Sequence, residues 1–183
     1  MKTARLELRL LKKSDYTSWK KAKGAQAQMK SRFDSAPASA KDLTRSKFYE
    51  LLREQAKKRK ADYAYVYGVF REDNLVGSVT IGGIQRGATH SATIGYQIFN
   101  NHWSKGYGTE AVGGLLEIAF KEQKLHRVVA GIEPGNDRSV KIVRKFRFRR
   151  EGFSKRVVLL RGEWKDLIQY ALTCEDYGIV WQG

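Results

Sequence analysis

The sequence predicts an α/β (α+β) fold with a central sheet of about seven strands and flanking helices. Apolar residues alternate with polar residues in some segments and recur at helical spacing in others. These segments follow one another as strand, two helices, three strands, helix, strand, helix and two strands, an order typical of a sheet covered by helices. Hydrophobic residues make up 42% of the 183 residues, enough to fill one core, so we expect a single domain over residues 1–183.

The first elements are a short strand and two helices joined by a loop. Residues 6–10 alternate leucine with charged residues, which indicates a half-buried strand, and Ser14 or Asp15 is expected to cap the helix that follows. Residues 24–39 are mostly small or polar, so we expect a loop there that could cover a site. Ser39 is followed three residues later by an aspartate, a pattern that resembles a capping box and predicts the start of an amphipathic second helix.

The rest of the chain alternates β-rich runs with turns and two further helices. The polar stretch 71–74 separates two β-rich runs, 63–70 and 75–81, and indicates a hairpin. A strand over 92–99 ends at the glycine-containing segment 100–108, after which apolar residues recur at helical spacing. The remaining elements are a strand over 128–132, a helix over 139–146, and two strands over 156–160 and 167–173 around Gly162.

The chain is strongly basic. It has 35 Lys plus Arg against 19 Asp plus Glu, a net charge of +16, and such a charge attracts phosphates, nucleic acids or acidic surfaces. Scattered lysines are equally well explained as a solvated surface, whereas a cluster favours a surface that faces a polyanion. One basic cluster lies late in the chain and consists of Arg138, Lys141, Arg144, Lys145, Arg147, Arg149, Arg150, Lys155 and Arg156.

The cysteine and histidine content argues against disulfides and metal chemistry. Cys174 is the only cysteine, so no intramolecular disulfide can form, and we expect its thiol to be buried and inert. His90, His102 and His126 have no metal-like spacing, and we predict no metal. The sequence has no run of about 18 apolar residues and no secretory leader, so we expect a cytoplasmic protein without a membrane partner.

The segment most informative about function lies between a predicted strand and a predicted helix. A helix start exposes unpaired amides and a partial positive charge, so it binds anions when the backbone can come close. Gly106 and Gly108 permit that approach, and Lys105 adds a full charge. Taken alone, a G-x-G pattern is more often simply a tight turn. The P-loop pattern is absent, and no acidic residue follows at the spacing of a dinucleotide site.

With this segment in place, the sequence resembles the GNAT (GCN5-related N-acetyltransferase) superfamily, and within it the Rim-type ribosomal-protein N-terminal acetyltransferases. The matches run through nearly the whole chain, and their order and spacing carry the resemblance. It implies a mixed central sheet whose splayed strands hold acetyl-CoA. The matching residues are Arg5, Leu6, Leu8, Arg9, Asp15, Leu75, Val76, Gly77, Ile94, Gly95, Tyr96, Trp103, Gly106, Gly108, Thr109, Glu110, Ala111, His126, Arg127, Asn136, Ser139, Gly162, Trp164 and Asp166.

The resemblance also implies how acetyl-CoA is held. The pantetheine arm would enter beside the strand that ends near Phe99, where Ile98 and Phe99 would offer backbone groups and an amide would polarise the thioester carbonyl. Asn136 matches the asparagine that contacts the cofactor arm, and Ser139 matches the serine that protonates the departing thiolate. Asn136 could instead shape a turn and Ser139 could cap its helix. The amides that would hold the pyrophosphate belong to Lys105, Gly106, Tyr107, Gly108 and Thr109.

The chain departs from the family at positions that carry chemistry in some relatives. The two positions of a carboxylate base correspond to Val158 and Thr93, and the position of a tyrosine acid corresponds to Val143. Glu133, after the predicted strand over 128–132, could reach the amine through water, although a carboxylate that neutralises nearby arginines explains it as well. Arg147 replaces the glycine that ends a helix in a left-handed turn, at a cost of about 1 kcal/mol.

The missing base favours one class of acceptor. An α-amine with a pKa near about 7.8 is about one-tenth neutral at pH 7, whereas a lysine near about 10.4 has roughly one part in a thousand or less. We therefore expect a direct attack by the N-terminal amine of a ribosomal or other protein, with the basic surface steering the enzyme to RNA-bound targets. A polyamine or antibiotic acceptor and a non-catalytic RNA-binding or ribosome-binding protein remain alternatives. Monomer and homodimer are both compatible with the sequence.

Overall fold

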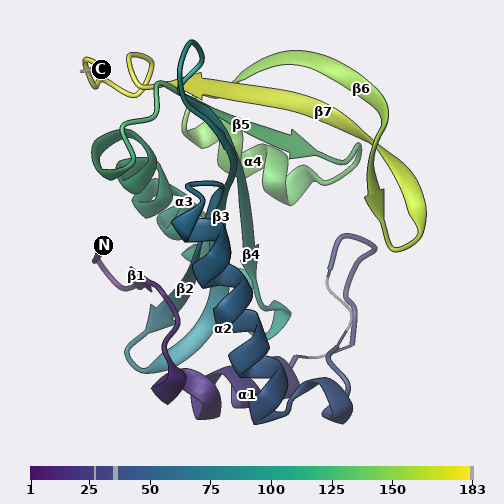
Figure 1. Cartoon of the computed structure of the whole chain (residues 1–183). Coiled ribbons are helices and arrows are strands. Elements are labelled where there is room, and N and C mark those ends of the chain that lie inside the picture. The colour runs from purple at the N-terminus through teal and green to yellow at the C-terminus, as the bar shows by residue number, and fades with distance from the viewer. Residues whose placement is uncertain (27, 35–36, 182–183) are drawn as a thin grey trace. The chain divides into compact units, whose positions relative to one another are not determined.

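The computed structural model describes residues 1–26, 28–34 and 37–181 (Figure 1). The chain divides into two compact units, Met1–Ile81 with Tyr96–Leu115, called unit 1, and Gly82–Gly95 with Leu116–Gly183, called unit 2. The single domain expected over residues 1–183 stays a prediction. Among the described residues, no helix combines the length and the apolar character that crossing a membrane requires.

The helices and strands follow the order expected from the sequence. The strands are β1 (Glu7–Arg9), β2 (Ala64–Arg71), β3 (Asn74–Gln85), β4 (Ser91–Ile98), β5 (Arg127–Ile132), β6 (Arg149–Leu160) and β7 (Glu163–Thr173). The α-helices are α1 (Tyr16–Gly24), α2 (Arg45–Lys60), α3 (Tyr107–Glu117) and α4 (Asp137–Lys145). Short 3-10 turns precede α1, α2 and α3, and a π-helical turn, Ile118–Glu122, follows α3.

The seven strands form one mixed sheet with the order β1-β2-β3-β4-β5-β7-β6. β1 is antiparallel to β2, and β7 is antiparallel to both β5 and β6. β4 and β5 are parallel. This arrangement confirms the predicted fold class, a mixed central sheet of seven strands with flanking helices.

Aromatic residues of α1 and α2 form the helical part of the core of unit 1. Phe48 of α2 is fully buried, and its ring centroid lies 5.0 Å from that of Trp19 and 5.9 Å from that of Tyr16, both on α1. Phe70 of β2 and Phe99, directly after β4, belong to the same cluster. Figure 1 shows α1 and α2 meeting in this region. The second helix is therefore amphipathic as predicted, with its apolar side in the core.

The expected start of α2 is wrong by several residues. The N-cap of α2 is Thr44, whose hydroxyl accepts a hydrogen bond from the Lys47 amide (3.3 Å). Ser39 and Asp42 instead close a 3-10 turn, in which the Ser39 hydroxyl donates to the Asp42 carboxylate (2.8 Å). Because two capping signals lie close together in the sequence, only the path of the chain after the 3-10 turn decides which one starts the helix.

Asp15 precedes α1 but does not cap it with its side chain. Its carboxylate accepts from the Lys12 amide (2.8 Å) and from two nitrogens of Arg9 (2.7 and 2.8 Å). The Arg9 guanidinium also lies over the Phe70 ring, 3.7 Å from its centroid. The Arg9–Asp15 pair thus joins β1 to the start of α1 and to the core.

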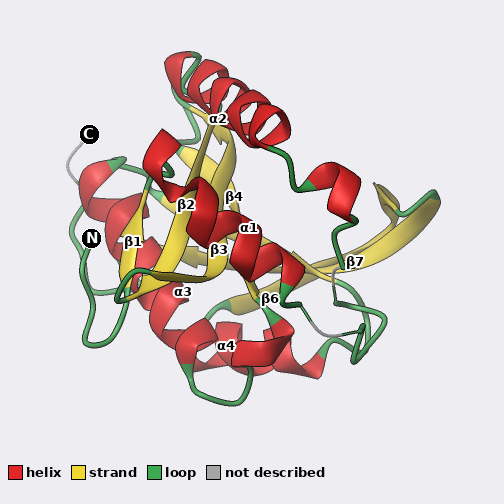
Figure 2. Ribbon diagram, turned by 90° about the horizontal axis from the view of Figure 1, so that it is seen from below, coloured by secondary structure: helices red, strands yellow, loops and turns green. Residues whose placement is uncertain are grey.

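Unit 2 is built around β5. All six residues of β5 pair with β7, from Arg127↔Thr173 to Ile132↔Ile168. The parallel ladder with β4 covers only Ser91↔Arg127 to Thr93↔Val129, although β5 runs on for three more residues. β6 and β7 form a long twisted ribbon (Figure 2). Both strands are longer than predicted. In β6, register shifts interrupt the alternation of side chains that marks a strand in the sequence.

The end of α4 explains the arginine that replaces a glycine in the family pattern. Arg147 has a φ of +61°, the left-handed conformation that favours glycine. The Phe148 amide donates to the Val143 carbonyl (3.1 Å), and the Arg147 amide donates to the Arg144 carbonyl (3.0 Å). This is the Schellman pattern of a helix C-terminus. The left-handed turn inferred from the sequence is therefore present.

Replacement of Arg147 by glycine is expected to stabilise the protein. Removal of the Cβ relieves the left-handed strain, so Arg147→Gly should raise the free energy of unfolding by about 1 kcal/mol. Chemical denaturation measures the difference. Arg147→Ala is the control, because it removes the same charge and keeps the strained Cβ; a gain of equal size in Arg147→Ala would contradict the explanation.

Candidate functional site

α3 starts directly after a loop with a left-handed backbone. Ser104 has a φ of +63° and Gly106 a φ of +79°, and α3 begins at Tyr107. The first amides of a helix have no acceptor in a preceding turn. Among the described residues, the first amide here with a backbone acceptor is that of Glu110, which donates to the Gly106 carbonyl (3.2 Å). Lys105 and Gly106 are exposed to solvent, so an anion can approach this helix start.

The N-terminal segment fixes this loop through Glu110. The Glu110 carboxylate accepts from the Thr3 hydroxyl and the Arg5 amide (both 2.6 Å) and from Arg5 Nε (2.7 Å). Arg5 Nη1 also donates to the Lys105 carbonyl (3.0 Å). Burial acts to raise the pKa of Glu110, but the hydrogen bonds from Thr3 and Arg5 outweigh it and the net pKa is lowered. The carboxylate is therefore ionised and is held by the N-terminal segment.

The positive potential of the loop comes from Lys105 and the helix start rather than from the neighbouring histidine. Burial, together with the charges of Lys105 and Arg71, lowers the pKa of His102. His102 is therefore neutral at pH 7, because its ordinary pKa is already about 6.5. A fixed charge and oriented amides suit an anion such as a diphosphate.

The end of β4 contacts the same loop. The Trp103 indole donates to the Ile98 carbonyl (2.6 Å). The Phe99 amide donates to the Val76 carbonyl of β3 (2.9 Å), and the Phe99 carbonyl accepts from the His102 amide (2.8 Å). Because backbone groups of successive strand residues point to opposite edges, the Ile98 amide faces the edge of β4 opposite β3. The Phe99 amide is therefore already used, whereas the Ile98 amide points away from β3.

A buried polar cluster beyond β4 was not anticipated from the sequence. Asn100 is 2% exposed and Asp34 is 4% exposed. Asn100 Nδ2 donates to Asp34 Oδ2 (2.6 Å), and Lys30 Nζ donates to the Asn100 carbonyl (3.2 Å). The Lys23 ammonium lies 4.9 Å from the Phe99 ring centroid, and burial lowers its pKa. The contacts of Lys30 and Asp34 with Asn100 join the loop after α1 to the segment that follows β4; that this loop covers a site stays a prediction.

The remaining predicted residues belong to unit 2 and lie between the end of β5 and the first turn of α4. They are Glu133, Asn136 and Ser139. Asn136 is the N-cap of α4, and its side-chain oxygen accepts from the Ser139 amide (3.3 Å). The capping role considered for Ser139 is therefore wrong, because Asn136 has it. Glu133 directly follows β5, and its carbonyl accepts from the Asn136 amide (3.1 Å). In the described part of the chain, Glu133 forms no ion pair that would support the arginine-neutralising explanation.

The positions that hold a base or an acid in some relatives are structural here. Val143 is fully buried in α4, Thr93 is exposed on β4, and Val158 pairs with Lys165 in the β6–β7 ribbon. Cys174 is 1% exposed, which confirms the expected burial. Burial, together with the neighbouring Glu175, raises the pKa of the Cys174 thiol to about 11. None of these side chains offers a carboxylate or a thiolate for proton transfer.

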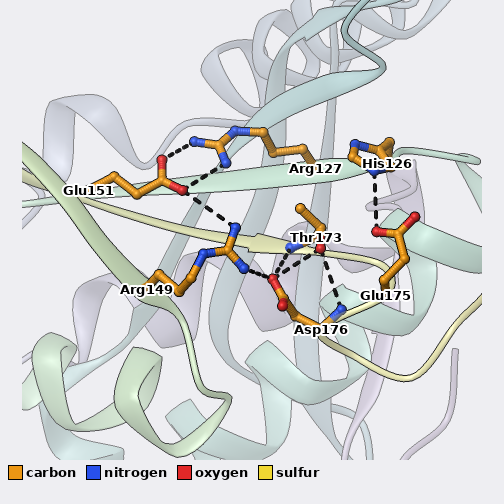
Figure 3. Close-up of polar contacts among 7 residues, drawn as sticks. All are labelled: His126, Arg127, Arg149, Glu151, Thr173, Glu175 and Asp176. Atoms are coloured by element: carbon orange, nitrogen blue, oxygen red, sulfur yellow. Dashed lines mark hydrogen bonds and ion pairs between the residues drawn. The ribbon is translucent and has the colours of Figure 1, made fainter.

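Charged side chains join the strand ends next to His126 and Arg127 (Figure 3). Arg127 at the start of β5 forms a two-pronged ion pair with Glu151 of β6. Arg149 contacts Glu151 (3.6 Å) and also binds Asp176, which follows β7. The hydrogen bond from Arg127 is the main reason why the pKa of Glu151 is lowered. The His126–Arg127 part of the family pattern therefore holds strands together in unit 2.

These observations define the class of protein. The family described as "Acetyltransferase (GNAT) domain" matches residues 5–149, and the chain belongs to this family. The first curated relative is the "Probable N-acetyltransferase YjcK" of Bacillus subtilis, 38% identical over 117 residues, which cover 63% of this chain and 65% of that protein. A second is the "[Ribosomal protein uS5]-alanine N-acetyltransferase" of Escherichia coli, 30% identical over 116 residues, which cover 62% and 60%.

Solved structures share the fold. RimJ of Mycobacterium smegmatis, in complex with CoA-disulfide, superimposes with a TM-score of 0.80 at 23% identity, covering 93% of this chain and 83% of that chain. The resemblance to the GNAT family inferred from the sequence is confirmed by the family match, and a Rim-type enzyme is among the curated relatives. The chain spans slightly less than two thirds of the length of the two curated relatives, 65% and 60%.

Proposed function

We propose that this chain transfers the acetyl group of acetyl-CoA to the N-terminal α-amine of a protein. The amine nitrogen attacks the thioester carbonyl directly, a C–N bond forms and the C–S bond breaks, without a covalent enzyme intermediate. The observation that carries the proposal is the start of α3. Its exposed left-handed loop presents Lys105 and helix amides, and the nearby carboxylate of Glu110 is already bound by Thr3 and Arg5.

Each predicted residue has a definite part in this proposal. The amides of residues 105–109 would bind the pyrophosphate, and the Ile98 amide would stabilise the oxyanion that forms at the thioester carbonyl. Asn136 Oδ1 caps α4, so the amide nitrogen of this side chain would contact the cofactor arm. Ser139 would donate a proton to the departing thiolate. Glu133 would accept the amine proton through water.

The candidate bases favour a protein N-terminus as the acceptor. Glu133 is a single weak candidate, and an α-amine near pH 7 needs less help from a base than a lysine does. The Escherichia coli relative is named for the alanine of ribosomal protein uS5, which supports extending an N-terminal acceptor to this chain. A polyamine or antibiotic acceptor calls for an exposed acidic pocket, whereas Asp34 of the covering loop is buried against Asn100.

The exposed basic cluster supports a second candidate, a protein that binds RNA or the ribosome. All nine basic residues between 138 and 156 are exposed, and Arg149 is held by Glu151 and Asp176. Exposed guanidinium and ammonium groups bind phosphates without sequence preference. In the proposed enzyme, this surface would bring the active site to RNA-bound proteins. In the alternative, binding RNA or the ribosome through this surface would be the protein's function.

Incubation with acetyl-CoA and peptides that begin with Ala or Ser tests the proposal. Free thiol should be released, and mass spectrometry should find the acetyl group on the first residue. The same peptide with a blocked N-terminus and an internal lysine is the control and should stay unmodified. If Ser139 is the acid, Ser139→Ala should lower kcat about 10-fold or more with little change in KM.

Two outcomes would count against the proposed function. Acetylation of the internal lysine alone would mean that the acceptor is wrong. No thiol release from any amine, combined with RNA retention on a filter that is lost at high salt, would favour the binding protein instead.

A further inference from the structure

Three side chains with metal-binding atoms meet at the end of the β5–β7 ladder. The ladder ends with Arg127↔Thr173, and one step further the Cys174 amide donates to the His126 carbonyl (2.9 Å). Residues directly opposite each other on antiparallel strands have their Cβ atoms close together on one face of the sheet. Glu175 is the next residue, and its carboxylate reaches back to the His126 ring (Figure 3).

The distances between the three donor atoms suit one bound ion. His126 Nε2 and Glu175 Oε2 are 3.2 Å apart, and with Cys174 Sγ the three donor atoms all lie within 4.8 Å of one another. Tetrahedral zinc bonds of about 2.1 Å to nitrogen and oxygen place these two atoms about 3.4 Å apart. In such a site the sulfur lies about 3.6 Å from the nitrogen and from the oxygen. Side-chain rotations that move the donor atoms by about 1 Å would complete this geometry.

The donor set determines which metal fits. An imidazole nitrogen, a thiolate sulfur and a carboxylate oxygen are the ligands of zinc, whereas magnesium and calcium require oxygen ligands throughout. We propose that His126, Cys174 and Glu175 bind one zinc ion, with water in the fourth position. Binding forms a Zn–S bond and releases the thiol proton of Cys174 to solvent, and His126 binds as the neutral ring.

The surroundings give the ion access and hold the ligands. Cys174 lines a cavity of about 200 Å³ together with Phe120, Lys121, Lys124, Ile179, Val180 and Trp181. The side chains of His126 and Glu175 are 37% and 52% exposed. The Trp181 ring contacts both His126 and His90 edge-on, with centroids 5.9 and 4.9 Å apart. Within the described residues, His90 Nδ1 is buried without a hydrogen-bond partner.

The sequence predicts no metal because these three residues do not have the short spacing of a known metal-binding motif. His126 is separated from Cys174 by the whole of α4 and the β6–β7 ribbon, and only the pairing of β5 with β7 brings them together. The zinc site does not depend on the proposed acetyl transfer.

Metal binding is tested on the full chain without an affinity tag, after treatment with a chelator. Calorimetry should show one zinc ion bound per chain with micromolar or tighter affinity, and zinc should raise the melting temperature. Cobalt, used as a coloured substitute, should give a thiolate-to-metal charge-transfer band. Cys174→Ser should abolish this band and weaken zinc binding about 10-fold or more, the loss expected even for outer-shell partners of a metal.

Two further variants keep the test decisive if Cys174→Ser disturbs the core. Glu175→Gln changes an exposed side chain and should also weaken zinc binding, with an unchanged circular dichroism spectrum. His102→Gln in unit 1 is the control and should bind zinc as the parent does. No charge-transfer band, or one-to-one binding that survives both Cys174→Ser and Glu175→Gln, would overturn the site.

Discussion

Gly106→Glu is expected to weaken the binding of coenzyme A by about 100-fold. Gly106 has a φ of +79° and lies in the exposed loop before α3. Any side chain there is strained, and a carboxylate would repel the pyrophosphate and compete for the helix amides. A Cβ at this position would also lie 3.3 Å from Arg5 Nη2, so the new carboxylate would disturb the Arg5–Glu110 contact that fixes the loop. Calorimetry with coenzyme A measures the effect.

Gly162→Glu is the matched control for this experiment. Gly162 has the same φ of +79°, and a Cβ built there meets no atom within 4 Å. The control therefore carries the same backbone strain and the same charge, and it should bind coenzyme A normally. Equal affinity of Gly106→Glu and the parent protein would remove the diphosphate site and, with it, the acetyl-transfer proposal.

Asp15→Asn is expected to lower the free energy of unfolding by about 3 kcal/mol, because it leaves the largely buried Arg9 guanidinium with only the more exposed Glu7 carboxylate as a counter-charge. The side chains of Arg9 and Asp15 are 24% and 8% exposed. The asparagine would keep an acceptor for the Lys12 amide but would turn an NH₂ group toward Arg9. Glu7→Gln is the control, because the Glu7 carboxylate lies 3.5 Å from Arg9 Nε and is 40% exposed. Such an exposed pair should contribute less than about 1 kcal/mol.

The effect of Asp15→Asn should depend on pH. Burial acts to raise the pKa of Asp15, but the hydrogen bonds from Arg9 and Lys12 outweigh it, and the net pKa is below the usual 3.8. The ionised form therefore stabilises the folded state above the unfolded pKa, and this contribution is lost as the pH falls through the folded pKa. Denaturation at pH 7 should show the full difference between parent and variant, and denaturation below pH 4 a smaller one. A difference that stays constant with pH would contradict the ionic explanation.

Local patterns in the sequence were sufficient for the order of the elements but not for their ends. Alternation located the first strand, and β-rich or apolar runs between turn residues located the other six. The predicted ends of the elements were wrong where the sequence allows two local structures. Thr44 caps α2 although Ser39 has the better capping pattern, and shifts in the register of β6 hide half of that strand. Such choices depend on contacts with distant residues.

The candidate site was predictable where neighbouring residues in the sequence form it. The segment from Lys105 to Thr109 is one such case: Gly106 adopts a positive φ before the helix, whereas Gly108 lies within the first turn of α3. The contacts of Glu110 with Arg5 and of Asn100 with Asp34 were not predictable, because about 105 and 66 residues separate the partners. No local pattern records such a pairing.

The sequence by itself determined the fold class and the family; anion binding by the loop before α3 stays a prediction. The fold class follows from the periodicity and the order of the elements, and the family follows from a resemblance whose matching residues run through nearly the whole chain. Only the tertiary structure decided that Asn136 rather than Ser139 caps α4, that the Phe99 amide is already used by Val76, and that Cys174 faces His126. Hydrogen-bond partners and metal ligands depend on which strands pair, and pairing is a property of the folded chain.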